Sequence, residues 1–437
     1  MPAHSLPFSP DCDEGFFQQL PASAAVFVLR GDGEPYVSKT ANLRRRLLRL
    51  LGPPAEHSKR LNLRGRVRDI EYTLTGSDFE SQVVLYRLLR AIFPKTYSAR
   101  LKLRPAPLVK LHLENEYPRA SITTRLSKLL RREGVTSSRA DQAFNTTQNH
   151  KWNSCPPALD NETSSQTGGE QSGQTRSVHN LYYGPFPSRT TAEKFASDAL
   201  DFFMMRRCVD DLHPDPSFPG CVYSEMKMCL APCFKGCTDF EYQAEVLRVQ
   251  NFFDTQGESL SREFAEQRDR ASADLAFEEA ATIHAKLEKL KPLLSQLPEI
   301  VRRVDQLRAL IIQPGAATES SSQSVSLFLF EACTLYGPVE FSIAPDAESR
   351  SIESRIEETL ARFSHSEARS TAERIEHLAI LKRWYYRSTR VGGIFFADQS
   401  GQWPMRRIVR GIGRVAKGEK PEVPGTFSAS QIAPSSS

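Results

Sequence analysis

The chain has 437 residues and a formal net charge of +5, and this length favours roughly two to four domains over a single core. No apolar run reaches the length of a membrane span, and residues 1–17 lack the apolar core of a secretory signal. Membrane-spanning and exported classes are therefore excluded, and a soluble, cytoplasmic protein is expected. Residues 30–110 hold 18 Lys and Arg against 7 Asp and Glu. That excess favours nucleic acid as a partner, with a solvated basic face as the alternative.

Residues 15–115 predict a compact α/β domain. Two apolar runs, Ala25–Leu29 and Tyr36–Val37, flank a Gly-Asp-Gly turn and indicate a β-hairpin. A helix is expected from residue 43, capped by Asn42, followed by a strand over 67–74 and a helix over 79–92. The candidate DNA contacts are six arginines on or after the first helix: Arg44, Arg45, Arg49, Arg64, Arg66 and Arg68.

Residues 99–135 predict two edge strands broken by Pro105 and Pro107. The composition then changes, because residues 137–178 are rich in Ser, Thr, Gln, Asn and Gly and poor in aliphatic side chains. Such a composition is typical of a disordered linker or insertion. Cys155 lies in this segment and is expected to be unpaired.

Residues 180–240 form a cysteine-rich region. Five of the chain's eight cysteines lie between Cys208 and Cys237, separated by 12, 7, 3 and 3 residues. The prolines among them favour an irregular loop over a helix or strand. Clustered thiols in a chain without an export signal are more often metal or iron–sulfur ligands than disulfides. Buried structural cysteines are the alternative.

Residues 241–296 predict a helical hairpin, with helices over 242–264 and 273–294. Residues 300–415 predict a small α/β domain of unknown role, and residues 416–437 a disordered tail. The expected strands of the 300–415 domain cover 324–332, 339–343 and 392–398, and its expected helices cover 351–363 and 367–386. A hairpin return is expected at 403–407. The aromatic residues 384–386 could stack on bases, but packing of this helix end on the sheet is the preferred interpretation.

Several N-terminal residues follow one family's order and spacing: Ala25-Val26-Phe27, Tyr36-Val37-Ser38-Lys39, Arg46 and Glu80. This arrangement resembles the GIY-YIG nuclease domain, and more narrowly the N-terminal half of UvrC, the nuclease component of bacterial excinuclease ABC. The resemblance implies hydrolysis of a DNA phosphodiester, with Tyr36 as the general base assisted by Lys39. Arg46 would contact the scissile phosphate, and Glu80 would hold Mg²⁺ or Mn²⁺.

The chain also departs from that family. Phe27 replaces the tyrosine of the first motif, Ser38 replaces the glycine of the second, and Arg87 stands where the family usually has asparagine. The supporting residues are therefore altered while the residues expected to do the chemistry are retained. An inactive nuclease fold kept for DNA binding is the alternative.

The cysteine region continues the resemblance. Residues 181–187 are similar to the segment that precedes the cysteines in the UvrC family, and the spacing of the first four thiols also agrees. In the family these four bind a [4Fe–4S] cluster, and the same thiolates could hold Zn²⁺ instead. The implied ligands are Cys208, Cys221, Cys229 and Cys233, which leaves Cys237 as an additional thiol.

Residues 274–291 resemble the UVR motif, through which members of the UvrC family pair with UvrB, another component of excinuclease ABC. The implied partner-binding residues are Phe277, Ala280, Ile283 and Leu287. A core or coiled-coil helix is the alternative.

Together these features imply an α+β multidomain protein, a truncated homologue of the UvrC family without its RNase H-like second nuclease. The expected function is the 3′-side incision of damaged DNA in nucleotide excision repair, with DNA and the UvrB component of excinuclease ABC as partners. Two alternatives are a non-catalytic DNA- and partner-binding protein and a zinc-stabilised scaffold.

Overall fold

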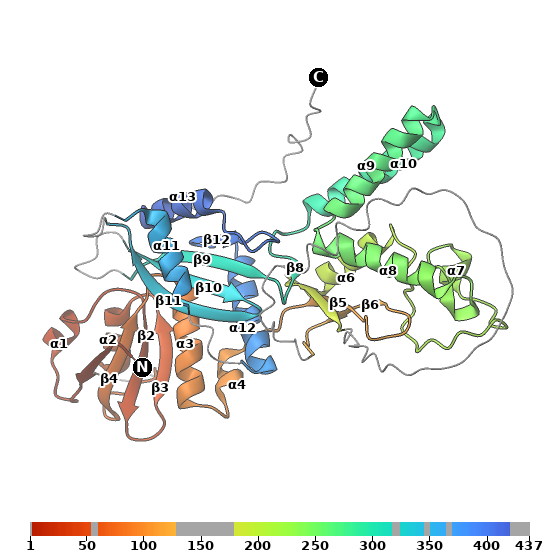
Figure 1. The fold of residues 1–437 in the computed structure, drawn as a ribbon. Coiled ribbons are helices and arrows are strands. Elements are labelled where there is room, and N and C mark those ends of the chain that lie inside the picture. The colour runs from red at the N-terminus through yellow and green to blue at the C-terminus, as the bar shows by residue number, and fades with distance from the viewer. Residues whose placement is uncertain are drawn as a thin grey trace, which may run out of the picture.

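The computed structural model describes residues 2–53, 60–127, 179–316, 324–344, 350–363 and 369–419. In these ranges the protein is a mixed α+β structure with three four-stranded antiparallel sheets (Figure 1). The predicted linker, Cys155 and nearly all of the predicted tail fall outside the described residues. None of the helices within these ranges combines the length and hydropathy of a membrane span.

The N-terminal sheet has the strand order β1-β4-β2-β3. Its strands are β1 (His4–Pro7), β2 (Ala25–Gly31), β3 (Tyr36–Thr40) and β4 (Val67–Leu74), with helices α1 (Glu14–Gln18), α2 (Leu43–Leu51), α3 (Asp78–Ile92) and α4 (Tyr97–Leu101). Alternation along β2 sends Phe27 and Leu29 toward α2, while Val26 and Val28 face α3. The sheet is therefore covered on both faces, as the unbroken apolar run of β2 indicates. The hairpin and helices α2 and α3 are confirmed, whereas β1 and α1 were not expected.

The middle sheet has the order β6-β5-β7-β8, formed by β5 (Leu108–Leu111), β6 (Ala120–Thr123), β7 (Leu181–Gly184) and β8 (Arg302–Arg303). The prediction of two edge strands broken by proline is wrong for β5, which lies between β6 and β7. Pro105 and Pro107 precede this strand and therefore remove no donor from its ladder. Helix α6 (Arg189–Leu200) packs on the sheet. The cysteine-rich loops follow with α7 (Val222–Glu225) and the 3₁₀ turn η1 (Pro232–Phe234).

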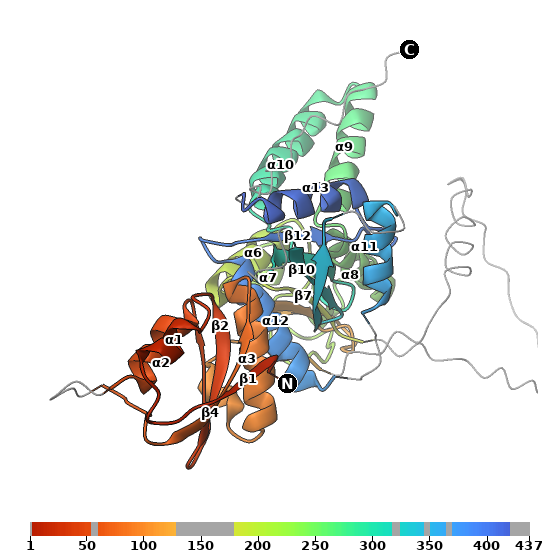
Figure 2. The ribbon, with the colours of Figure 1, turned by 90° about the vertical axis from the view of Figure 1, so that its left-hand side faces the viewer.

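Three helices follow the cysteines: α8 (Asp239–Asp254), α9 (Glu258–Ala273) and α10 (Phe277–Ser295). The predicted continuous helix over 242–264 is wrong, because Gln256 and Gly257 take positive φ values and end α8. A Cβ on Gly257 would lie 2.2 Å from a Leu294 methyl carbon, so the turn requires glycine. Helices α9 and α10 pair as a hairpin that projects from the body (Figures 1 and 2).

The C-terminal sheet has the order β11-β10-β9-β12, formed by β9 (Arg308–Pro314), β10 (Ser324–Glu331), β11 (Thr334–Ser342) and β12 (Gly393–Phe396). Helices α11 (Ile352–Ala361) and α13 (Met405–Ala416) pack on one face, and α12 (Thr371–Tyr385) on the other. The predicted hairpin return at 403–407 is wrong. Pro404 caps α13, whose Ile408, Ile412 and Val415 recur at helical spacing against the sheet.

The N-terminal and C-terminal sheets are joined through one core. The ring of Phe79 on α3 lies 5.0 Å from that of Phe328 on β10 and 5.1 Å from that of Trp384 on α12. Figure 2 shows α12 running beside α3. Packing of the residue 384–386 helix end, which the sequence favoured over base stacking, is confirmed for Trp384, which is 7% exposed.

Candidate functional site

Tyr36 and Arg46 form the part of the candidate nuclease site that the structure brings together. Strand β3 and helix α2 place them so that the Arg46 guanidinium donates a hydrogen bond of 2.9 Å to the Tyr36 phenolic oxygen. The Tyr36 ring also lies 6.1 Å from the ring of Phe27. The arginine Nε is buried without a hydrogen-bond partner among the described residues. A cation that donates to a phenolic oxygen stabilises negative charge there, which suits a general base.

Lys39 lies on the opposite face of the same sheet. Because side chains alternate along a strand, residues three positions apart point to different faces, and Tyr36 faces α2 while Lys39 reaches α3. The Lys39 ammonium forms an ion pair of 2.7 Å with Asp78, which Arg387 also contacts. The two cations and these hydrogen bonds keep the pKa of Asp78 below its ordinary value although partial burial opposes them.

Glu80 lies in the first turn of α3, where its carboxylate is already engaged. One oxygen accepts the Gly76 amide hydrogen at 2.8 Å, and the other accepts the Ser326 hydroxyl hydrogen at 3.3 Å. The residue is 6% exposed. Burial raises its pKa, the nearby Glu340 adds to this, and the two donors oppose it. The C-terminal strand β10 therefore covers the predicted metal ligand.

Among the described residues, no group of three His, Cys, Asp or Glu side chains is arranged to hold a metal ion, around Glu80 or elsewhere. Mg²⁺ is commonly bound by one or two carboxylates together with waters and substrate phosphates. Glu80 therefore stays a predicted ligand whose carboxylate already accepts hydrogen bonds from Gly76 and Ser326.

The six predicted DNA-contacting arginines fall into two groups. Arg45 and Arg49 are exposed on α2, and Arg44 is exposed although its Nε binds the Leu20 carbonyl. Arg66 and Arg68 are exposed and bind Asp32 in the turn between β2 and β3.

Arg64 also anchors the N-terminal segment through its guanidinium. Its guanidinium donates to the carbonyl oxygens of Pro10, Leu51 and Cys12 at 2.7–2.8 Å. All three of its nitrogens are therefore used to hold the N-terminal segment against α2.

The four predicted cluster ligands lie close enough to one another to interact electrostatically. Burial, together with the smaller effects of the Cys208, Cys221 and Cys233 thiols, raises the pKa of the Cys229 thiol to about 11, against the Ala231 amide. The thiol of Cys237 interacts with Cys233 among the cysteines but mainly with Glu241 and Asp239. The first four cysteines thus form one group, with Cys237 at its edge.

Hydrogen-bond donors are directed at two of these sulfurs. The Ala231 amide donates to the Cys229 sulfur at 3.3 Å, and Arg206 donates to the Cys208 sulfur at 3.4 Å. Arg206 is 2% exposed and also binds the carbonyl oxygen of Tyr117, which fixes the loop to the body. The thiols are mutually near but are not spaced as metal ligands in the described structure. Soft thiolates with amide donors are the chemistry that iron–sulfur and zinc sites use.

The predicted partner-binding residues on α10 are divided between the tip of the hairpin and its interior. Phe277 is 65% exposed and neighbours the exposed Leu275, whereas Ala280 is half-buried. Ile283 and Leu287 are buried in the core to which α9 also contributes. The tip is therefore open to a partner, while Ile283 and Leu287 hold the hairpin together.

Three residues at this site were not predicted from the sequence. Asp78 and Arg387 engage Lys39, and Ser326 engages Glu80. Asp78 follows the helix-capping Ser77, so an acidic first turn was a local signal for it. No local signal exists for Ser326 and Arg387, which come from distant parts of the chain.

Comparison with known proteins gives matches to UvrC-type excinuclease proteins. Residues 161–252 match the family model for the UvrC/Cho excinuclease middle domain. The chain is similar to UvrABC system protein C of Rickettsia canadensis, with 22% identity over 299 residues, covering 68% of this chain and 38% of that protein. The corresponding protein of Rickettsia bellii is 23% identical over 272 residues, covering 62% and 35%. The chain spans less than two fifths of these relatives' length. No solved structure gave a significant match.

Proposed function

We propose that this chain acts in nucleotide excision repair as a DNA endonuclease of the UvrC type, making the incision on the 3′ side of a lesion. The similarity to UvrABC system protein C over about two thirds of the chain supports the repair role. The observation that carries the endonuclease proposal is the hydrogen bond from Arg46 to the Tyr36 phenolic oxygen.

The proposed chemistry uses the face of the N-terminal sheet that α2 covers. Tyr36 would take the proton from the attacking water, and Arg46 would neutralise charge on the phosphoryl oxygens. The exposed arginines Arg44, Arg45 and Arg49 on α2 would hold flanking DNA phosphates. Lys39 points to the other face of the sheet, where it pairs with Asp78, so breaking that ion pair alone would not bring its ammonium to Tyr36.

A second candidate function is DNA and partner binding without incision. The observation that favours it is the burial of Glu80 beneath β10, where Ser326 and Gly76 occupy its carboxylate. An endonuclease of this type needs a cation against the developing phosphoryl charge. A protein locked in this arrangement would bind DNA without cutting it.

Two further parts of the chain have proposed roles in either case. Cys208, Cys221, Cys229 and Cys233 would hold a [4Fe–4S] cluster, or Zn²⁺, when the site is loaded. Such a centre stabilises a loop that has little apolar core of its own. The exposed tip of the α9–α10 hairpin would dock on UvrB, with Phe277 as its apolar anchor.

The experiment that separates the two functions measures binding and cutting in one sample. A lesion-bearing duplex loaded with the UvrA and UvrB components of excinuclease ABC is incubated with the whole chain in Mg²⁺ and in Mn²⁺. A cut on the 3′ side supports the endonuclease. Stable complex formation without a cut in either metal supports the binding protein.

A further inference from the structure

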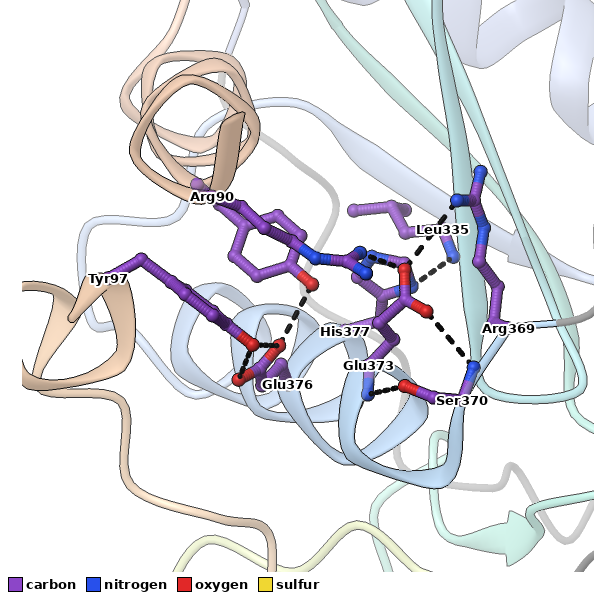
Figure 3. Close-up of polar contacts among 9 residues, drawn as sticks. Arg90, Tyr97, Leu335, Arg369, Ser370, Glu373, Glu376 and His377 are labelled. Carbon is purple, nitrogen blue, oxygen red and sulfur yellow. Dashed lines mark hydrogen bonds and ion pairs between the residues drawn. The ribbon is translucent and has the colours of Figure 1, made fainter. Parts of the chain in front are cut away.

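A pocket outside the candidate nuclease site lies between α3, α12 and the start of β11. Its volume is about 340 Å³, and its charged and polar walls come from Tyr86, Arg87, Arg90, Arg369, Glu373 and His377. Figure 3 shows Arg90, Arg369 and His377 around Glu373, with Glu376 turned toward the Tyr97 hydroxyl. Arg87 and Arg90 follow Glu80 by seven and ten positions on α3, which is about 10–15 Å along a helix. The pocket is therefore distinct from the Tyr36–Arg46 pair.

The pocket walls have an excess of positive charge. They carry three guanidiniums and one carboxylate, that of Glu373, which is 6% exposed. Glu373 contacts Arg90, lies 3.5 Å from Arg369 and accepts the Ser370 amide hydrogen at 3.0 Å. Within the described ranges, no hydrogen bond or ion pair joins Arg87 to another side chain. Guanidiniums therefore outnumber carboxylates three to one on the pocket walls, which favours an anion as the ligand.

His377 adds a neutral donor to the same wall. Its Nδ1 accepts the Leu335 amide hydrogen at 3.2 Å, so the ring proton resides on Nε2. Burial, together with the smaller effects of Arg87, Arg369 and Arg90, lowers the pKa of His377 to about 3. The imidazole is thus uncharged at neutral pH, and all three guanidiniums are near it.

Tyr86 and Tyr97 both bind Glu376, a residue next to the pocket. Both hydroxyls donate to Glu376, at 2.9 Å and 3.0 Å, so this carboxylate is engaged next to the pocket (Figure 3). The Tyr86 ring also packs edge-on against the His377 ring, with centroids 5.3 Å apart. The imidazole and the neighbouring arginines are therefore held by fixed elements of both α3 and α12.

We propose that this pocket binds a phosphate group, as a nucleotide or as a terminal phosphate on DNA. A phosphate monoester carries close to two negative charges at neutral pH, which suits walls on which guanidiniums outnumber carboxylates. Guanidiniums bind phosphate oxygens in paired hydrogen bonds, and Arg87 and Arg369 approach from different segments of the chain. The volume exceeds that of a bare phosphate and lies in the range of small-ligand sites. This inference does not depend on the proposed endonuclease.

The test is calorimetric titration of the whole chain with inorganic phosphate at constant ionic strength set by chloride. Wild type should bind phosphate, and Arg87→Gln should bind it at least tenfold more weakly. Arg87 is exposed and makes no side-chain ion pair within the described ranges, so its loss should leave the fold intact. Arg383→Gln, an exposed arginine on α12 that does not line the pocket, is the matched control and should bind as wild type does.

A nucleoside 5′-monophosphate and a 5′-phosphorylated oligonucleotide then distinguish the sources. Stronger binding of the first assigns the pocket to free nucleotides, and stronger binding of the second than of its unphosphorylated form assigns it to DNA ends. In wild type, bound phosphate should also raise the pH at which the NMR resonance of His377 titrates, because the negative charge of phosphate offsets the positive charge of the arginines. Phosphate binding that is absent, or equal in Arg87→Gln and wild type, would overturn the proposal.

Discussion

Ser326 donates a hydrogen bond to Glu80 across 246 positions of sequence, and both side chains are buried. This contact joins the first turn of α3 to the C-terminal strand β10. It also places the residue expected to hold a divalent metal beneath a sheet that the sequence assigns to a domain of unknown role. The access of a divalent metal to Glu80 therefore bears on the choice between the two proposed functions, incision of DNA and DNA binding without incision.

Replacing Glu80 by Gln should stabilise the protein at neutral pH. Burial raises the pKa of Glu80 above its ordinary 4.5, so the folded protein holds this proton more tightly than the unfolded chain does. Stability is therefore lost as the pH rises from 4.5 through the raised value, by at most about 1.4 kcal/mol per pH unit for one group. Thermal melts from pH 4 to pH 8 should show a higher Tm for Glu80→Gln at pH 7 that converges on wild type near pH 4. A lower Tm of the variant at pH 7 would instead mean that the ionised carboxylate stabilises the fold.

Phe79→Ala should weaken the contact between the two sheets. The Phe79 ring is 3% exposed and lies between Phe328 and Trp384, so its removal leaves a cavity at the junction. Large-to-small changes of this kind cost about 3–5 kcal/mol. Chemical denaturation followed by tryptophan fluorescence measures the loss. Phe240→Ala, at an 83% exposed position, is the control and should change stability by less than about 0.5 kcal/mol.

Cys229→Ser should abolish metal or cluster binding in the loop. Cys229 is the most buried of the four thiols, and burial together with the three other cysteines raises its pKa, so its sulfur interacts with all three. Anaerobically purified wild type should contain iron and sulfide, or zinc, in fixed ratio to protein, and the variant less than about a tenth of it. Cys237→Ser should keep the wild-type content. Equal metal content in Cys229→Ser and wild type would remove Cys229 from the ligand set.

Leu275→Asp with Phe277→Asp should prevent binding to UvrB without unfolding the hairpin. Both side chains are exposed at the tip, at 71% and 65%, and such apolar anchors contribute about 2 kcal/mol or more to an interface. Pull-down with UvrB should show the loss while helical circular dichroism is unchanged. Ile283→Asp, in contrast, should lower the helical signal, because Ile283 is buried within the hairpin. Retained binding in the tip variant would show that this tip is not the interface.

The elements predicted correctly from the sequence were those with a strong local pattern. The run from Ala25 to Leu29 and the leucine spacing of α2 were sufficient for the first hairpin and helix. Strand β9 was missed because its apolar run has no turn signal before it. Helix α13 was misread because Trp403 and Pro404 resemble a turn, although proline is also common at a helix start.

The candidate site was predicted only in part, and for a physical reason. Residue types and order identify Tyr36, Lys39 and Arg46, but strand alternation puts Lys39 on the face opposite Tyr36. The odd spacing of Tyr36 and Lys39 in the sequence predicts this separation. The sequence does not predict that β10 covers Glu80, because that contact depends on packing between segments 246 positions apart.

The most direct test of the central claim is the incision rate of a lesion-bearing duplex, loaded with UvrA and UvrB, under single-turnover conditions. The variants are Tyr36→Phe and Arg46→Gln, with Arg383→Gln, exposed on α12, as the control. If Tyr36 and Arg46 cut DNA, each variant should lose about 10²-fold or more in rate while duplex binding is retained. Arg383→Gln should stay within a few-fold of wild type. Incision by Tyr36→Phe at the wild-type rate would contradict the account.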